Sequence, residues 1–330
     1  MIGGSNSEAQ SGTGKQAAAP DIVDLAEMSP EQIQKFLDSF DIVMSDCDGV
    51  LWYVDKLIPG SLKAVGTLSK MGKKLYLVTN NSAVKRETYL ERMRPSGLHM
   101  KLDQIINTAR VISWYLKMIQ FSDEAFVIGS PVFRQALIDD GIKLAPTEIK
   151  LEKEDLFSIV HALNDNASVK AVIADFSIKY DYLKIAYALS CLSREDVLYI
   201  CGAQDDWIAY AADQKILGSG PMIDIITRLS GKKPINCAKP SETLGKFVLK
   251  ACDVHDPKRC LFIGDSLQTD IKFGKLCGFQ TLLVGSGVNK IEDAEQSQEN
   301  RPDFYISSLR LLNPTLDSLY SPTVDKEDSN

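Results

Sequence analysis

Several features are missing from this 330-residue chain, and each absence excludes a class of protein. No apolar run approaches the ~20 residues that a membrane-spanning helix needs. The seven cysteines are scattered, odd in number and without a CxxC pair, which favours free thiols in a reducing compartment over disulfides or zinc. There is no basic tract, and the net charge of −7 argues against a nucleic-acid backbone as partner. These absences predict a cytoplasmic protein with neither a membrane nor a nucleic-acid partner.

What is present is an ordinary globular composition. Apolar residues make up 45% of the chain and charged residues 25%, so a large core is expected. Apolar strand-like runs alternate with amphipathic helical stretches, which predicts an α/β fold with parallel sheets and helices on both faces. The amino terminus has no basic segment followed by an apolar one, so no secretory signal is expected.

The pattern along the chain divides it into a core, an insertion and two tails. Residues 1–20 are rich in Gly, Ser and Ala and are predicted to be disordered, and residues 319–330 are predicted to be a flexible tail. A discontinuous catalytic core is predicted over 21–119 and 217–318, with an inserted α/β cap over 120–216. The core strands are expected at Ile42–Asp46, Lys74–Thr79, Gln104–Asn107, Arg259–Gly264 and Thr281–Gly285.

Two aspartates separated by one residue follow the first of these strands, in VMSDCDGVLW. Asp46 can stay ionised beside a metal ion and attack phosphorus, making an aspartyl phosphate. Asp48, placed off the metal, can hold a proton for the leaving oxygen and later take one from water. Gly49 allows a sharp backbone turn whose exposed N–H groups can bind an anion.

Further polar groups follow later strands. In LYLVTNNS an apolar strand ends in Thr79 and Asn80, which offer a hydroxyl and an amide where a phosphoryl oxygen could sit. Lys239 in NCAKPS could balance nearby carboxylates and stabilise charge on a transferring group.

Acidic residues also end the strand in FIGDSLQTDI. Asp265 is a candidate metal ligand. Asp270 is either a second metal-binding carboxylate or a residue outside the coordination sphere that orients the metal ligands through hydrogen bonds. Carboxylates brought together at strand ends need a divalent cation or a shared proton. Oxygen ligands suit Mg²⁺, which also binds substrate phosphate. An isolated DxD, TNN or KP is usually a turn or a helix cap, but their order and their positions at strand ends together indicate phosphoryl transfer.

With these motifs the chain resembles the haloacid dehalogenase superfamily, from about residue 25 to residues 302–309. It is most similar to the capped branch of 4-nitrophenylphosphatases, phosphoglycolate phosphatases and pyridoxal-phosphate phosphatases. The resemblance implies a Rossmann-like core, a large cap inserted between the second and third motifs, and Mg²⁺-dependent hydrolysis of small phosphomonoesters. It also implies a homodimer formed through the cap.

Carried over by motif position, the resemblance assigns a role to each candidate. Asp46 is the nucleophile, and Asp48 is the acid/base whose backbone carbonyl also binds Mg²⁺. Thr79 and Asn80 bind the phosphoryl group. Lys239 neutralises charge, and Asp265 completes the metal site.

The chain departs from the family pattern where the cap returns to the core. Relatives usually read ATNxD there, whereas this chain reads CGAQDDW over Cys201–Trp207. Asp205, Asp206 and Trp207 could contact the leaving group or form an exposed loop, and Asp175 in the cap could set specificity or serve structure. Cys47, between the catalytic aspartates, is expected to be a packed thiol more often than a redox switch.

Two other functions stay open: a phosphoprotein phosphatase, and an idle scaffold that binds a phosphometabolite or a protein.

Overall fold

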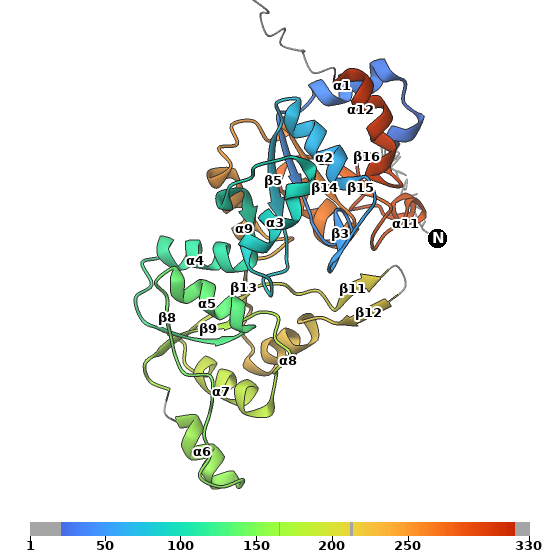
Figure 1. The fold of residues 1–330 in the computed structure, drawn as a ribbon. Coiled ribbons are helices and arrows are strands. Elements are labelled where there is room, and N and C mark those ends of the chain that lie inside the picture. The colour runs from blue at the N-terminus through green and yellow to red at the C-terminus, as the bar shows by residue number, and fades with distance from the viewer. Residues whose placement is uncertain (1–20, 165, 212–213, 321–330) are drawn as a thin grey trace, which may run out of the picture.

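The computed structural model of the chain describes residues 21–164, 166–211 and 214–320. Residues 1–20, which were predicted to be disordered, lie outside the described residues. So do residues 321–330 of the predicted C-terminal tail. The described residues form two α/β units, each built on a parallel sheet (Figure 1).

The larger unit contains a seven-stranded sheet with the order β1-β16-β15-β14-β2-β5-β6. Every neighbouring pair in it is parallel. Its strands are β1 Val23–Asp24, β2 Ile42–Ser45, β5 Lys74–Val78, β6 Ile105–Ile106, β14 Cys260–Gly264, β15 Gln280–Val284 and β16 Phe304–Ile306. The central strands β2 and β14 are buried along their whole length, which explains their continuous apolar sequences.

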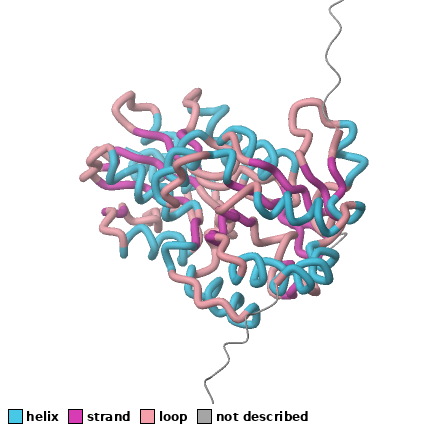
Figure 2. Tube along the Cα trace, turned by 90° about the horizontal axis from the view of Figure 1, so that it is seen from above, coloured by secondary structure: helices cyan, strands magenta, loops and turns pink. Residues whose placement is uncertain are grey.

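Helices cover both faces of this sheet. They are α1 Pro30–Asp38, α2 Ser61–Lys70, α3 Arg86–Met93, α4 Thr108–Met118, α9 Glu242–Ala251, α10 Lys272–Cys277, α11 Ile291–Gln296 and α12 Asn313–Leu319. Successive residues of β2 face opposite sides: Val43 packs in one apolar cluster with α1 and α2, and Met44 packs in another with α4 and α9. The doubly wound core predicted from the sequence is confirmed, with strands inside and helices around them (Figure 2).

The smaller unit contains a five-stranded parallel sheet with the order β13-β10-β9-β7-β8. Its strands are β7 Glu124–Ile128, β8 Lys143–Leu144, β9 Val169–Ala174, β10 Leu198–Cys201 and β13 Ile235–Asn236. Its helices are α5 Pro131–Asp139, α6 Leu156–Asn164, α7 Tyr182–Leu192 and α8 Gly220–Ser230. Both α8, which lies beside α7, and β13 come after residue 216, where the cap was predicted to end. The boundary itself stays a prediction.

Two short hairpins meet between the units, and neither was predicted. The first joins β3 Trp52–Tyr53 to β4 Lys56–Leu57 in the larger unit. The second joins β11 Trp207–Ala211 to β12 Gln214–Leu217 in the smaller unit, and β11 lies beside β3 (Figure 1). Strands of two to five residues carry little periodic signal, which is why the sequence did not indicate them.

One apolar cluster runs through both units. It includes Met44 and Val78 from the larger sheet together with Val127, Ile173 and Ile200 from the smaller one. The units therefore share a continuous core. No helix among the described residues has the length and apolar character to cross a membrane.

Some predicted elements begin or end elsewhere. The strand expected at Gln104–Asn107 shortens to β6, because Leu102–Gln104 form a 3₁₀ turn and Asn107 caps α4. Helix α10 is preceded by a π-helical turn over Leu267–Ile271. There the Asp270 carboxylate turns back to accept hydrogen bonds from the N–H groups of Asp265 and Ser266, at 3.0 and 3.1 Å. Such local departures are frequent at functional sites.

Candidate active site

The two aspartates of the first motif follow β2 at the centre of the larger sheet. The Asp46 N–H donates to Ile263 O in β14 at 2.9 Å, so this residue continues the ladder one step beyond the strand. The chain then turns at Gly49, whose φ of +83° is one that glycine adopts freely. The Gly49 N–H donates to Trp52 O at 2.7 Å, which closes the turn before β3.

Lys239 lies between two carboxylates. Its Nζ is 2.8 Å from Asp46 Oδ1 and 2.8 Å from Asp270 Oδ1, and its side chain is buried. Burial alone would lower the pKa of Lys239, but the carboxylates of Asp270 and Asp46 outweigh it and raise the pKa. The ion pairs therefore favour the charged form of Lys239 beside Asp46.

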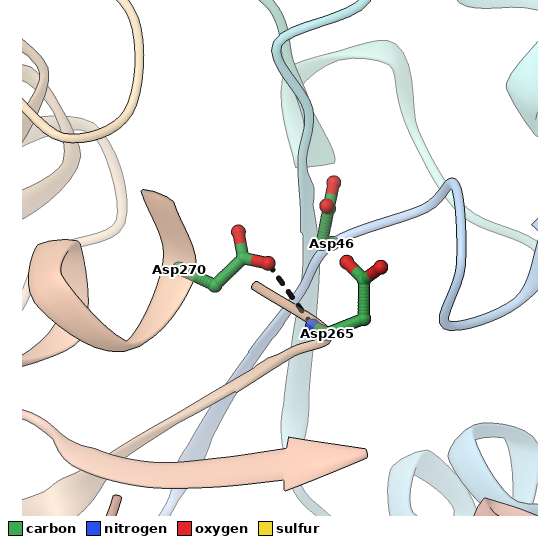
Figure 3. A group of neighbouring side chains, drawn as sticks. All are labelled: Asp46, Asp265 and Asp270. Atoms are coloured by element: carbon green, nitrogen blue, oxygen red, sulfur yellow. Dashed lines mark hydrogen bonds between the residues drawn. The ribbon is translucent and has the colours of Figure 1, made fainter. Parts of the chain in front are cut away.

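Asp46, Asp265 and Asp270 form one carboxylate cluster at the ends of β2 and β14 (Figure 3). Each offers one oxygen, and these oxygens lie within 4.8 Å of one another. Burial raises the pKa of Asp46 to about 7; Lys239 opposes this shift and Asp270 adds to it. Burial, together with the charges of Asp270 and Asp46, raises the pKa of Asp265 well above its usual range. Two buried acids and the half-buried Asp46 beside one lysine leave negative charge that a divalent cation would neutralise.

The hydrogen bonds separate Asp265 from Asp270. Both oxygens of Asp270 are occupied, one by Lys239 Nζ and the other by the N–H groups of Asp265 and Ser266. Asp265 has one oxygen bonded to the Val288 N–H at 2.8 Å. Hard oxygen donors of this kind fit Mg²⁺, and Asp46 and Asp265 are the residues free to hold it.

The Asp48 carboxylate is not part of that cluster. It accepts a long hydrogen bond of 3.4 Å from Asn81 Nδ2. Burial raises the pKa of Asp48, although Asn81 and the Val54 N–H oppose the shift. A carboxyl group that keeps its proton more readily is able to act as a general acid and then as a base.

Thr79 and Asn80 follow β5, next to β2 in the sheet. Thr79 is buried, and its Oγ1 accepts a hydrogen bond from the Asn81 N–H at 3.1 Å. The Asn80 side chain is engaged otherwise. Its Oδ1 accepts from the Lys239 N–H at 2.8 Å, and its Nδ2 donates to Lys239 O and to Asp205 Oδ2, both at 3.1 Å. In this arrangement the Asn80 side chain fixes the segment that carries Lys239.

Asp175, at the end of β9, joins the two units from the side of the cap. Its carboxylate is fully buried and accepts from Ser82 Oγ and Thr108 Oγ1, both at 2.7 Å. Burial raises the pKa of Asp175 to about 6, while Thr108 and Ser82 oppose that shift. The sequence analysis noted Asp175 but not its partner Thr108. Asp175 could be found because it directly follows an apolar strand, as Asp46 and Asp265 do in the core, whereas no sequence feature indicated Thr108.

Cys47 is completely buried, in agreement with a packed thiol. Burial and the charges of Asp46 and Asp48 raise the pKa of the Cys47 thiol well above its usual value. The thiolate that oxidation requires is therefore disfavoured.

Comparisons with known proteins agree with this geometry. A family model described as haloacid dehalogenase-like hydrolase matches residues 43–143, and one described as HAD-hydrolase-like matches residues 236–312. The chain is 30% identical to a 4-nitrophenylphosphatase of Schizosaccharomyces pombe, over 87% of this chain and 98% of the relative. It is 29% identical to glycerol-3-phosphate phosphatase of Homo sapiens, over 88% and 95% of the two chains. Phosphoglycolate phosphatase 1A of Arabidopsis thaliana is 30% identical, over 86% and 80%.

A solved structure shares the fold. Glycerol phosphate phosphatase from Mycobacterium tuberculosis, solved in complex with magnesium, superposes with a TM-score of 0.67 at 19% identity. The match covers 84% of this chain and 77% of that one. At this identity the likeness establishes a common architecture of core and cap.

Proposed function

Because this chain belongs to the haloacid dehalogenase-like hydrolases and is a phosphatase by its relatives, we propose that it hydrolyses small phosphomonoesters with Mg²⁺ through an aspartyl-phosphate intermediate. The substrates would be 4-nitrophenyl phosphate and metabolites of the kind named for its relatives, with pyridoxal phosphate as a further candidate. A cytoplasmic homodimer formed through the cap belongs to the same proposal.

One observation carries this proposal: Lys239 Nζ holds Asp46 Oδ1 at 2.8 Å inside a cluster that could bind a divalent cation. Lys239 and the Cys47 N–H, at 2.7 Å, both bond to the same oxygen of Asp46. The other oxygen has no hydrogen-bond partner among the described residues. A fixed, charge-balanced carboxylate with one free oxygen is what nucleophilic attack on phosphorus requires.

The chemistry then divides between the two aspartates. Asp46 attacks phosphorus, the bond from phosphorus to the leaving oxygen breaks, and Asp48 gives that oxygen its proton. Asp48 next takes a proton from water, and the water oxygen attacks the aspartyl phosphate, which releases phosphate and restores Asp46. Lys239 stabilises charge on the transferring group throughout. Mg²⁺ held by Asp46 and Asp265, with the Asp48 carbonyl, would neutralise the phosphoryl oxygens.

The decisive experiment measures phosphate release with and without Mg²⁺ in the wild type and in Asp46→Asn. The amide has the shape of the carboxylate but cannot form the intermediate, so turnover should vanish while the unfolding midpoint stays near that of the wild type. Asp41→Asn, just before the same strand, is the matched control. It removes an exposed ion pair with Arg259, which contributes little to stability, and should leave turnover unchanged.

Two other functions predict different results in the same assay. A phosphoprotein phosphatase would release phosphate from phosphopeptides faster than from small esters. An idle scaffold would bind a phosphomonoester without releasing phosphate. Equal turnover in the wild type and Asp46→Asn would refute the proposed mechanism.

A further inference from the structure

The Asp175 carboxylate of the smaller unit is held by two hydroxyl groups of the larger one. It lies at the end of β9 with none of its surface exposed. Its Oδ1 accepts hydrogen bonds from Ser82 Oγ at 2.7 Å and from the Phe176 N–H at 2.6 Å, and its Oδ2 accepts from Thr108 Oγ1 at 2.7 Å. One buried group of the cap therefore binds the core at two points.

The cap fixes the position of this carboxylate by contacts of its own. The Asp175 N–H donates to Ile128 O in β7 at 2.9 Å, and the Tyr180 hydroxyl donates to Asp175 O at 2.9 Å. A Cβ on Gly202, directly after β10, would lie only 1.7 Å from Asp175 Oδ2, so the carboxylate lies against bare backbone on that side. Removal of one core hydroxyl should therefore leave the carboxylate in place.

Ser82 lies in the loop between β5 and α3, close behind Thr79. Within this loop the Asn81 N–H donates to Thr79 Oγ1 at 3.1 Å, and the Ala83 N–H donates to Asn81 Oδ1 at 3.0 Å. Asn81 Nδ2 also donates to Asp48 Oδ2 at 3.4 Å. The residues of the loop are thus bonded to one another, so a displacement of Ser82 also displaces Thr79.

Thr108 makes the same hydrogen bond from a different element. It is the first residue of α4 and lies outside the loop after β5. Thr108 and Ser82 are both buried, and their hydroxyls are equally distant from the carboxylate. Loss of either hydroxyl should cost comparable stability, because each loss leaves the same buried carboxylate with one donor fewer. The two residues differ in that Ser82 alone belongs to the loop that contains Thr79.

We propose that Asp175 is a positioning residue for phosphate binding. Through Ser82 it places the loop that begins at Thr79, so the cap contributes to the geometry of the phosphate site. The inference rests on the proposed role of Thr79 in binding the phosphoryl group. It predicts that the bond from Ser82 affects phosphate affinity, whereas the bond from Thr108 affects stability alone.

The test measures the Kd of inorganic phosphate by titration calorimetry in MgCl₂, which requires no turnover. Ser82→Ala removes the hydroxyl in the loop, and Thr108→Val, the matched control, removes the other hydroxyl with little change of shape. We expect Ser82→Ala to raise the Kd about tenfold, as for a misplaced hydrogen bond to a charged group, and Thr108→Val to leave it unchanged. Urea unfolding should show a loss of stability in both variants.

Asp175→Ala tests the other end of the same hydrogen bond. It should raise the Kd as Ser82→Ala does, and the double variant should bind phosphate no more weakly than either single variant, because each breaks the same link. Independent contributions would instead multiply to about a hundredfold, which would contradict the inference. If Asp175→Ala does not fold, the comparison of Ser82→Ala with Thr108→Val decides alone.

Equal shifts of the Kd in Ser82→Ala and Thr108→Val, or no shift in either, would overturn the positioning role. Hydrolysis of 4-nitrophenyl phosphate by the wild type, measured separately, tests the proposed function. Phosphate binding without hydrolysis would refute that function, and the Kd comparison would still decide the role of Asp175. A wild type that neither binds phosphate nor hydrolyses the ester would refute both. If phosphate binds too weakly for calorimetry, its inhibition constant against 4-nitrophenyl phosphate gives the same comparison.

Discussion

Asn80 and Lys239 exchange two hydrogen bonds across 159 residues of sequence. The Lys239 N–H donates to Asn80 Oδ1 at 2.8 Å, and Asn80 Nδ2 donates back to Lys239 O at 3.1 Å. A side-chain amide thus pairs with a backbone peptide as one strand pairs with another. The consequence is that Asn80, in the loop after β5, sets where the Lys239 cation lies relative to Asp46.

Replacing Asn80 with alanine should therefore impair catalysis through the lysine. Loss of both bonds leaves a largely buried peptide unpaired and should cost about 1–3 kcal/mol of unfolding free energy. A displacement of Lys239 by even 1 Å should lower kcat by about 10²-fold. Urea unfolding and phosphate-release kinetics measure the two effects.

Asn313→Ala is the control for this variant. Asn313 Nδ2 donates to Gly60 O at 3.0 Å, away from the site. Loss of this hydrogen bond should lower the free energy of unfolding and leave kcat unchanged. A wild-type kcat in Asn80→Ala would show that the lysine is positioned without this pair.

Gly49 provides a test of the proposed metal site in which neither proposed ligand residue is replaced. A Cβ there would lie 2.2 Å from Asp265 Oδ2, so Gly49→Ala must displace the Asp265 carboxylate. Gly72 has a similar φ of +91°, but a Cβ there would meet nothing within 4 Å. Both alanine variants carry the backbone strain, about 1–2 kcal/mol, and only Gly49→Ala should also raise the Mg²⁺ concentration needed for half-maximal activity. Equal Mg²⁺ requirements in the two variants would contradict the placement of Asp265.

Binding of Mg²⁺ should also stabilise the folded chain, since the unfolded chain has no such cluster. At a Mg²⁺ concentration about 100 times its Kd, the free energy of unfolding should rise by about 2.7 kcal/mol. Thermal melts in MgCl₂, compared with NaCl of equal ionic strength, measure this rise. Asp265→Asn should abolish the rise and Asp41→Asn should preserve it. An identical rise in Asp265→Asn would place the ion elsewhere.

The core of the site was predictable because it consists of strand ends. Apolar runs that finish in Asp46, Thr79 and Asp265 become neighbouring parallel strands, and parallel strands deliver their carboxyl ends to one edge. The sequence pattern indicates where each strand ends, and the parallel pairing of the strands then brings the residues after those ends together.

Side-chain orientation was beyond that reasoning. The sequence placed the Asn80 amide on the phosphoryl group, whereas in the structure its three hydrogen bonds go to Lys239 and Asp205. Which partner an amide selects depends on the packing of segments far apart in sequence. The hairpins β3–β4 and β11–β12 were not predicted for a related reason. Their strands form through pairing with each other and show little periodicity of their own.

The buried carboxylate of Asp175 should make stability depend on pH in a defined direction. Its pKa rises from 3.8 to about 6 on folding, chiefly because burial disfavours the charged form. The folded chain thus holds this proton more tightly, and the free energy of unfolding should decrease as pH rises through the window from about 4 to 6. At about 1.4 kcal/mol per pKa unit, the Asp175 contribution is about 2–3 kcal/mol. Asp175→Asn cannot ionise, so the unfolding free energy of the wild type minus that of the variant should grow by this amount between pH 7.5 and pH 4.

Asp181→Asn is a control with the opposite sign. Burial is the largest single influence and acts to raise the pKa of Asp181, but the hydrogen bonds and the charge of Lys184 together outweigh it and lower the pKa, and the carboxylate is half exposed. Its small contribution to stability is therefore present at neutral pH and is lost as pH falls. Urea denaturation of the three proteins at several pH values gives the comparison directly. A wild-type minus Asp175→Asn difference that stays flat from pH 7.5 to pH 4 would mean that Asp175 remains ionised when buried. In that case the hydroxyls of Ser82 and Thr108, both 2.7 Å from its oxygens, compensate the charge in full.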